Sequence, residues 1–316
     1  MNFKAKKGAA MNTEYAVKTN NLSKIYGAKA AVSHLNMEVK TGDIYGFIGR
    51  NGSGKSTTLK MCCGLVHPTE GEISLYGAPV KNQNARRRVG MLIEEPGLYP
   101  HMTARENMIL NAKCLGLADL SSVDAILELL SLSHAGKKKV RQFSMGMRQR
   151  LGIAMALLGN PDLLILDEPI NGLDPEGIRE VRECLIRLNE EAGKTIVISS
   201  HILGELSKLA TRYGIIKDGE LIRQISRKKL EEQCRDYLDL KVDDADRTAA
   251  LLSEYYPDAG YEVFGRNQLH VFDFQESAPL TTLLVQNGIA VQSSSLHRMD
   301  LEEYFLDLME GGAQNA

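Results

Sequence analysis

The stretch "GRNGSGKST", Gly49–Thr57, decides the fold of this chain. It matches the pattern G-x-x-x-x-G-K-[ST], and it stands between the apolar run "IYGFIG", which begins at Ile44, and a predicted helix. Glycines here let backbone N–H groups curl around phosphate oxygens. A Gly-rich turn without function is the alternative, which the strand–loop–helix context disfavours. The stretch therefore predicts a phosphate-binding loop in an α/β fold.

Two side chains of this loop have expected roles of their own. Lys55 supplies a point charge to the β- and γ-phosphates of a nucleotide, and the hydroxyl of Ser56 is a ligand for Mg²⁺. The predicted nucleotide-binding positions of the loop are Gly49, Asn51, Gly52, Ser53, Gly54, Lys55, Ser56 and Thr57.

Two downstream runs, "DLLILDEP" from Asp162 and "KTIVISS" from Lys194, are continuous apolar β segments. Such runs are typical of parallel strands that are covered on both faces, and the predicted helix between them completes a βαβ unit. Asp167 and Glu168 end the first run, where two acids are costly unless a cation is near. We expect Asp167 to hold Mg²⁺ through water and Glu168 to polarise an attacking water. A pair of capping acids is the alternative.

His201 directly follows the second run. Ligand groups in α/β folds gather at the carboxyl ends of strands, so we expect His201 to contact the γ-phosphate. A purely structural histidine is the alternative reading.

A second candidate anion site begins the segment "FSMGMRQRLGIA", which starts at Phe143. Ser144 has the character of a helix N-cap, and a helix N-terminus with Ser and Gly favours an anion. Helical periodicity extends from Thr103 to about Gly159, whereas short alternating strands and turns fill the chain from Tyr15 to about Gly90.

Composition narrows the classes of protein. The chain has 316 residues, a net charge of −2 and 43% hydrophobic residues, which is enough for a full core and gives no reason to expect a nucleic-acid partner. Its five cysteines form no C-x-x-C pair and show no zinc spacing, which suggests reduced thiols. No apolar run reaches the ~18 residues of a membrane span, and the N-terminus lacks the apolar region of a signal peptide. We therefore expect a cytoplasmic chain.

Seven segments between about Lys18 and Gly219 resemble, in their order along the chain, the motifs of the ATP-binding subunits of ABC transporters. They are an aromatic residue at Tyr26, the loop Gly49–Thr57, a gate loop "MLIEEPGLYP" at Met91–Pro100, a signature "FSMGMRQR", the strand Leu163–Glu168, "NGLD" at Asn171–Asp174, and His201.

The resemblance implies a P-loop NTPase core of the ABC ATPase type that binds ATP and Mg²⁺ and hydrolyses ATP. Tyr26 would stack on adenine. In this family, two ATP-binding domains associate head to tail. Ser144 and Gly146 of one copy would then contact the γ-phosphate held by the other, and Asp174 would belong to the nucleotide site. The resemblance thus implies a homodimer that drives a separate membrane permease, which places the chain on the inner face of the cell membrane.

Two motifs depart from the usual pattern of the family. Met145 and Met147 replace a small and a polar residue of its L-S-G-G-Q signature. Glu94 stands where the gate loop normally carries Gln, and we expect it to contact Mg²⁺ and the attacking water. Glu95 is the alternative bearer of this role. These features are similar to transporters of bacitracin-like and lantibiotic peptides, which export the peptide or clear it from the membrane.

Two other functions stay open at this point. A soluble ABC ATPase could act on ribosomes or DNA, although ribosomal types usually carry two ATP-binding domains and DNA-repair types a long coiled coil. A regulatory module could bind ATP without turnover, against which Lys55, Asp167, Glu168 and His201 argue.

The sequence predicts four segments. They are a disordered leader at 1–14, the ATP-binding domain at 15–222, a connector at 223–236, and an α+β accessory domain at 237–316. Within the ATP-binding domain we expect a helical subdomain at about 100–160 and an antiparallel β subdomain before it. In the accessory domain, strands expected at 237–242, 261–264, 269–274 and 290–295 and helices at 245–255, 278–287 and 300–310 follow the order of a ferredoxin-like module.

Overall fold

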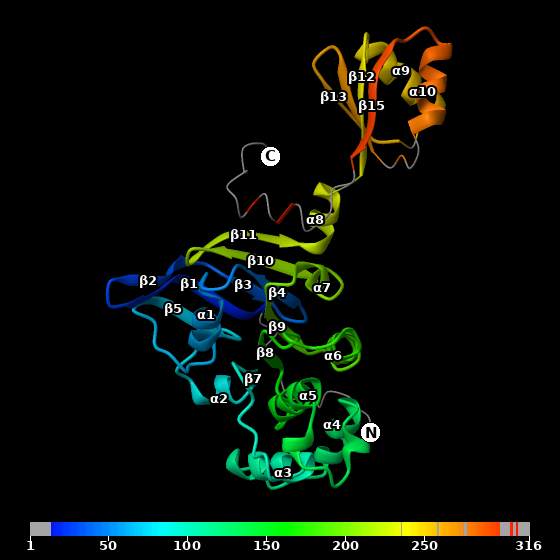
Figure 1. Ribbon diagram of the computed structural model, residues 1–316. Helices are drawn as coiled ribbons and strands as arrows, with labels where there is room; N and C mark the ends of the chain where they lie inside the picture. Colours follow the sequence, from blue (N-terminus) through cyan, green and yellow to red (C-terminus); the bar gives the residue numbers. More distant parts are fainter. Residues whose placement is uncertain are drawn as a thin grey trace. The chain divides into compact units, whose positions relative to one another are not determined.

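Figure 1 shows the computed structural model of the protein, which describes residues 14–234, 236–257, 259–272, 274, 277–297, 304, 305 and 308. The chain divides into two compact units between Arg227 and Lys228. That boundary lies inside the stretch 223–236 that the sequence predicts as a connector. The predicted leader, apart from Glu14, and most of the helix expected at 300–310 lie outside the described residues.

The first unit begins with an antiparallel sheet built around the long strand β1 (Tyr15–Tyr26). Strand β1 pairs with β2 (Lys29–Leu35), β3 (Glu38–Lys40) and β5 (Glu70–Leu75), and β5 pairs in turn with β6 (Ala78–Pro79). Apolar side chains of this sheet, such as Val17, Leu22 and Leu75, are fully buried. The predicted N-terminal antiparallel β subdomain is confirmed.

A six-stranded sheet forms the centre of the first unit, in the order β11-β10-β4-β9-β8-β7. Its strands are β4 (Ile44–Ile48), β7 (Val89–Leu92), β8 (Leu163–Asp167), β9 (Thr195–Ser200), β10 (Arg212–Lys217) and β11 (Glu220–Ser226). All neighbours are parallel except β10 and β11. Every residue of β4, β8 and β9 is buried, as the continuous apolar runs predict. The carboxyl ends of these three strands therefore meet at one edge of the sheet.

Helix α1 (Lys55–Cys62) follows β4, α2 (Gln83–Arg86) precedes β7, α6 (Pro175–Glu190) connects β8 to β9, and α7 (Leu203–Ser207) follows β9. Three more helices, α3 (Ala104–Cys114), α4 (Ser122–Leu129) and α5 (Met145–Ala156), lie beside one another in the range 100–160 (Figure 1). Thr103 and Glu106 form a capping box at the start of α3, which fixes where this helix begins. No helix among the described residues is long and apolar enough to cross a lipid bilayer.

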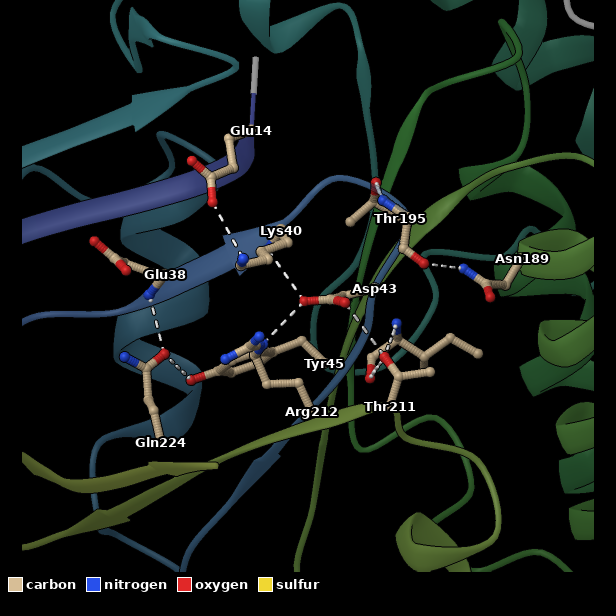
Figure 2. A network of polar contacts seen from close by, with 12 residues as sticks. Glu14, Glu38, Lys40, Asp43, Tyr45, Asn189, Thr195, Thr211, Arg212 and Gln224 are labelled. Atoms are coloured by element: carbon tan, nitrogen blue, oxygen red, sulfur yellow. Dashed lines mark hydrogen bonds and ion pairs between the residues drawn. The ribbon is translucent and has the colours of Figure 1, made fainter. Parts of the chain in front are cut away.

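A polar network ties the antiparallel sheet to the amino end of the parallel sheet (Figure 2). Gln224 accepts hydrogen bonds at Oε1 from the Tyr45 hydroxyl, at 2.8 Å, and from the Glu38 backbone N–H, at 3.0 Å. Arg212 forms an ion pair with Asp43 at 3.2 Å. Burial raises the pKa of Tyr45, so its hydroxyl remains a donor. This network lies opposite the sheet edge that carries the predicted site.

Helix α8 (Arg227–Gln233) begins at the boundary between the units. The second unit then follows the order β12 (Tyr237–Val242), α9 (Ala245–Tyr255), β13 (Tyr261–Phe264), β14 (Gln268–Phe272), α10 (Ser277–Gln286) and β15 (Val291–His297). Its sheet has the order β13-β14-β12-β15, with antiparallel neighbours throughout. A core of buried apolar residues, including Leu240, Leu252 and Leu284, joins strands and helices. This is the ferredoxin-like arrangement that the sequence suggests.

Candidate active site

The loop after β4 has a backbone that only glycine suits at two of its positions. A Cβ on Gly49 would lie 2.5 Å from Ser53 Oγ and 2.6 Å from the Ile216 carbonyl oxygen. Gly54 has a φ of +106°, and a Cβ there would lie 2.5 Å from the Ala31 carbonyl oxygen. The loop is therefore pressed against neighbouring backbone, which leaves its own N–H groups to shape the concave side.

Lys55 begins α1 and is buried, with 5% of its surface exposed. Its Nζ donates hydrogen bonds to the carbonyl oxygens of Gly49, at 2.7 Å, and Arg50, at 3.2 Å. It also lies 3.4 Å from Glu168 Oε1. The ammonium is thus held inside the loop, and Glu168 supplies the charge that balances it.

Glu168 leaves β8 with a φ of +49°, in the left-handed region that residues other than glycine seldom adopt. Its backbone N–H donates to Ser199 Oγ at 2.9 Å, and that hydroxyl donates to Asp167 Oδ1 at 2.6 Å. Ser199 and Asp167 face each other on neighbouring parallel strands and are both buried. Ser199 therefore stabilises the turn that places the two acids. Sequence reasoning missed this serine, although its place at the end of "IVISS" was a signal.

His201 completes the group, with its Nδ1 atom 2.9 Å from Glu168 Oε2. The carboxylate of Glu168 therefore lies between the Lys55 ammonium and the His201 imidazole. The structure thus brings together three of the residues that the sequence singles out, from the ends of three neighbouring strands.

The oxygen atoms at this sheet edge fit a nucleotide phosphate and Mg²⁺. Ser53 Oγ and Glu168 Oε1 are buried polar atoms without a hydrogen-bond partner in the described part of the chain, and burial without a partner is costly. Ser56 and Asp167 offer the hard oxygen ligands that Mg²⁺ prefers. The described residues contain no group of three or more His, Cys, Asp and Glu that could hold a metal alone. Mg²⁺ usually keeps several waters and phosphate ligands, so one or two protein oxygens suffice.

The gate loop places Glu94 beside α1. Glu94 has a φ of +62°, and its Oε1 lies 2.5 Å from Nζ of Lys60. This hydrogen bond raises the pKa of Lys60. Sequence reasoning missed Lys60, although it lies four residues after Ser56 and so on the same face of the helix.

The remaining predicted residues stand apart from this group. Ser144 is the N-cap of α5 and accepts from the Met147 N–H at 3.2 Å, as predicted. Asp174 is the N-cap of α6 and accepts from the Gly177 N–H at 3.1 Å. Among the described residues, no hydrogen bond or ion pair joins either cap to Lys55.

Two further predicted positions are accessible to a ligand. Tyr26 ends β1 with 51% of its surface exposed, and Nζ of Lys24 lies 5.0 Å from the centre of its ring. Gly146 lies in the first turn of α5, where a Cβ would meet only ordinary van der Waals contacts.

Known proteins match both units of the chain. A family model described as ABC transporter matches residues 32–171. The bacitracin transport ATP-binding protein BcrA of Bacillus licheniformis is 44% identical over 299 residues, which are 94% of this chain and 98% of that protein. The lantibiotic transport ATP-binding protein SrtF of Streptococcus pyogenes is 44% identical over 206 residues, covering 65% of this chain and 89% of its own.

Solved structures resemble the first unit. A dimeric ATP-binding cassette in a post-hydrolysis state, bound to ADP and Pi, matches with a TM-score of 0.61 at 30% identity, over 67% of this chain and 98% of that chain. The fold and these relatives agree with the resemblance drawn from the seven motifs. The chain therefore belongs to the ABC transporter family, in which it is an ATP-hydrolysing, ATP-binding subunit.

Proposed function

We propose that this ATPase drives a separate membrane permease that exports an antimicrobial peptide of the bacitracin or lantibiotic type, or clears it from the membrane. The match to the bacitracin protein carries this proposal. It spans 94% of the chain and 98% of the relative, so it necessarily includes most of the C-terminal unit as well as the ATPase unit. The relatives named above are transport proteins, which favours this function over an ATPase of ribosomes or DNA.

In the proposed hydrolysis, Glu168 is the general base. Its Oε1 accepts no hydrogen bond from the described residues but faces Lys55 Nζ at 3.4 Å, so it can accept a proton from the attacking water once Lys55 turns to the phosphates. His201 fixes the other oxygen at 2.9 Å and so orients the carboxylate, and its ring extends the group toward the γ-phosphate. Lys55 binds the β- and γ-phosphates, whose charge exceeds that of the two carbonyl oxygens it now contacts.

Ser56, Asp167 and Glu94 would hold Mg²⁺ in this proposal. The ion supplies positive charge to the β- and γ-phosphates as charge develops during transfer. Asp167 keeps its orientation through the hydrogen bond from Ser199 at 2.6 Å, which leaves its second oxygen for the ion or for water.

A second copy of the chain would complete each site. Ser144 and Gly146 begin α5, whose N-terminal N–H groups favour an anion. In a head-to-tail pair they would bind the γ-phosphate held by the partner's loop, and Asp174 would adjoin the same site. Tyr26, half exposed, would stack on adenine. The dimeric cassette that resembles this chain supports a pair but not its orientation.

The permease would contact a hollow of about 970 Å³ beside the gate loop. Its lining includes Glu95 and Pro96 of that loop, together with the exposed apolar side chains of Met91 and Leu115. Contact there would join movement of the permease to the gate loop and hold the chain at the inner face of the membrane.

The proposal is tested in cells that produce the chain together with a membrane permease that copurifies with it. We expect such cells to resist bacitracin or a lantibiotic, and cells with the Glu168→Gln variant to lose most of that resistance. Unchanged susceptibility to both peptides would reject the substrate class. Recovery of the chain with ribosomes, and not with membranes, would favour the alternative function.

A further inference from the structure

Lys60 lies beside the proposed site and contacts Glu94 of the gate loop. It is on α1, one helical turn after Ser56, and its ammonium lies 2.5 Å from Glu94 Oε1. The Lys60 side chain is 29% exposed, whereas that of Glu94 is 67% exposed. An ion pair at such a surface usually stabilises a fold very little. Its geometry therefore calls for a reason other than stability.

The backbone shows that Glu94 is constrained. A φ of +62° is unfavourable for a residue with a side chain, and such residues cluster at functional sites. Glu94 thus directs its carboxylate to Lys60 from a conformation that the gate loop must maintain.

The contact with Glu94 also keeps Lys60 charged. Hydrogen bonding to Glu94 is the main cause that raises the pKa of Lys60, so Lys60 remains a cation. Lys60 is therefore a cation in direct contact with Glu94, one of the three proposed Mg²⁺ ligands.

The charges near the phosphates explain why a cation is needed there. Lys55 is balanced by Glu168, at 3.4 Å. Asp167 and Glu94 add two negative charges, where a neutral glutamine in the gate loop would leave one. The carboxylates of Asp167 and Glu94 both repel a nucleotide triphosphate when no metal is bound, because like charges at close range oppose binding.

We propose that Lys60 is a positioning residue that offsets the charge of Glu94, so that the chain can bind ATP before Mg²⁺ arrives. This inference rests on the proposed nucleotide and metal site. Lys60 contacts neither substrate nor metal in this role; it acts through Glu94.

A set of variants separates the effect of the Lys60 charge from the effect of its side-chain packing. Lys60→Met keeps most of the aliphatic stem and removes the charge, which leaves Glu94 unpaired. We expect Lys60→Met to weaken ATP binding without metal by about three- to tenfold, from the Coulomb energy of one nearby charge in water-exposed surroundings. Lys60→Arg should bind like the parent. Adding Glu94→Gln to Lys60→Met should restore binding, since the charge to be offset is gone.

The experiment measures the dissociation constant of a fluorescent ATP analogue for the purified full chain, in EDTA and in excess Mg²⁺. Lys113→Met is the matched control, because Lys113 is a lysine in the last turn of α3. Thermal unfolding shows that each variant is folded. The difference between parent and Lys60→Met should shrink in Mg²⁺, since the ion also neutralises Glu94, and in high salt.

An unaltered dissociation constant in Lys60→Met would overturn the proposal. So would equal weakening in Lys60→Met and in the double variant, because the loss would then not pass through Glu94. Failure of the parent chain to bind the analogue at all would instead count against the proposed nucleotide site, and unchanged peptide susceptibility against the proposed transport function.

Discussion

The imidazole of His201 and the carboxylate of Glu168 are hydrogen-bonded, with 2.9 Å between Nδ1 and Oε2. Lys55 approaches the other carboxylate oxygen at 3.4 Å. Glu168 is therefore oriented from both sides, although it occupies an unfavourable backbone conformation with a φ of +49°. This constraint gives the proposed general base one fixed position relative to the phosphate-binding loop.

Glu168→Gln should keep ATP binding and nearly abolish turnover. The amide retains the shape of the side chain, but it cannot accept the proton of the attacking water, and loss of a positioned base typically costs ~10²–10⁴-fold in rate. The trapped nucleotide should also hold two copies together. Phosphate release and size-exclusion elution with ATP and Mg²⁺ measure both effects. A monomeric variant that hydrolyses ATP at the parent rate would remove Glu168 from this role.

Ser199→Ala should reduce both stability and turnover. The substitution removes the donor to Asp167 and the acceptor of the Glu168 N–H, and it leaves buried polar groups without partners, at a cost of about 1–3 kcal/mol. We expect a lower melting temperature for the ATPase unit and a kcat several-fold below that of the parent.

The matched control for Ser199→Ala is Ser200→Ala, at the neighbouring buried serine of the same strand. Ser200 Oγ accepts a hydrogen bond from the Ile202 N–H and contacts neither acid in a described hydrogen bond. The Ser200→Ala variant should have a lower melting temperature, with little change in kcat. Equal loss of turnover in both variants would mean that Ser199 does not position the acids.

The C-terminal unit should lose stability as the pH falls below about 6.5. Burial lowers the pKa of His270 below this ordinary value, and nearby His297 acts in the same direction, while Asp239 and Glu262 oppose them. The unfolded chain then binds the proton more readily than the folded unit, so stability falls with pH until His270 is protonated in both states. Above the ordinary value the effect vanishes.

His270→Phe tests this expectation, because phenylalanine can keep the stacking on Tyr237, whose ring centre lies 4.1 Å away. The melting temperature of the full chain, compared at pH 7.5 and 5.5, should fall less for His270→Phe than for the parent. His101→Phe, at an exposed histidine of the ATPase unit, controls for the loss of a titrating ring. Parallel falls in the parent and His270→Phe would contradict the prediction.

The sequence predicts most of the fold because its signals are local. Continuous apolar runs end at Asp167 and Ser200, and parallel strands in an α/β fold bring such ends to one edge, so the meeting of Glu168 and His201 could be expected. The ferredoxin-like unit follows in the same way from the order of its strands and helices. Strands β12 and β13 have the expected bounds, and those of β14 and β15 differ by one or two residues.

The strand-end position of Ser199 and the helix-face position of Lys60 were signals in the sequence, but the partners of these two residues could not be read from it. Ser199 acts because the register of two parallel strands sets it opposite Asp167, and apolar periodicity does not specify register. Lys60 acts because the gate loop turns at Glu94 with a positive φ, and a loop that contains no glycine at this point gives no sign of such a turn. The roles of both residues therefore depend on contacts between segments that are distant in the sequence, and the motifs do not specify these contacts.

Two inactive variants should partly restore each other if the proposed head-to-tail pair is correct. Lys55→Ala removes the phosphate contact of one copy, and Ser144→Arg blocks the start of α5, where the Ser144 hydroxyl caps the helix. Each variant alone should be inactive, because every site then lacks one of its two parts. A mixture contains heterodimers in which one site combines an intact loop with an intact signature.

The measurement is ATPase activity of the mixture, with heterodimers verified by two different affinity tags. Random pairing makes about half of the dimers heterodimers, each with one complete site, so we expect about a quarter of the parent activity when the sites act independently. Mixing Lys55→Ala with Glu168→Gln is the matched control, because both residues belong to the same half of a site. In that heterodimer one site lacks Lys55 and the other lacks the base Glu168, so the pair should stay inactive. If verified heterodimers of Lys55→Ala and Ser144→Arg are as inactive as the control pair, while the parent protein with the same two tags hydrolyses ATP, the arrangement in which each site is shared between copies is contradicted.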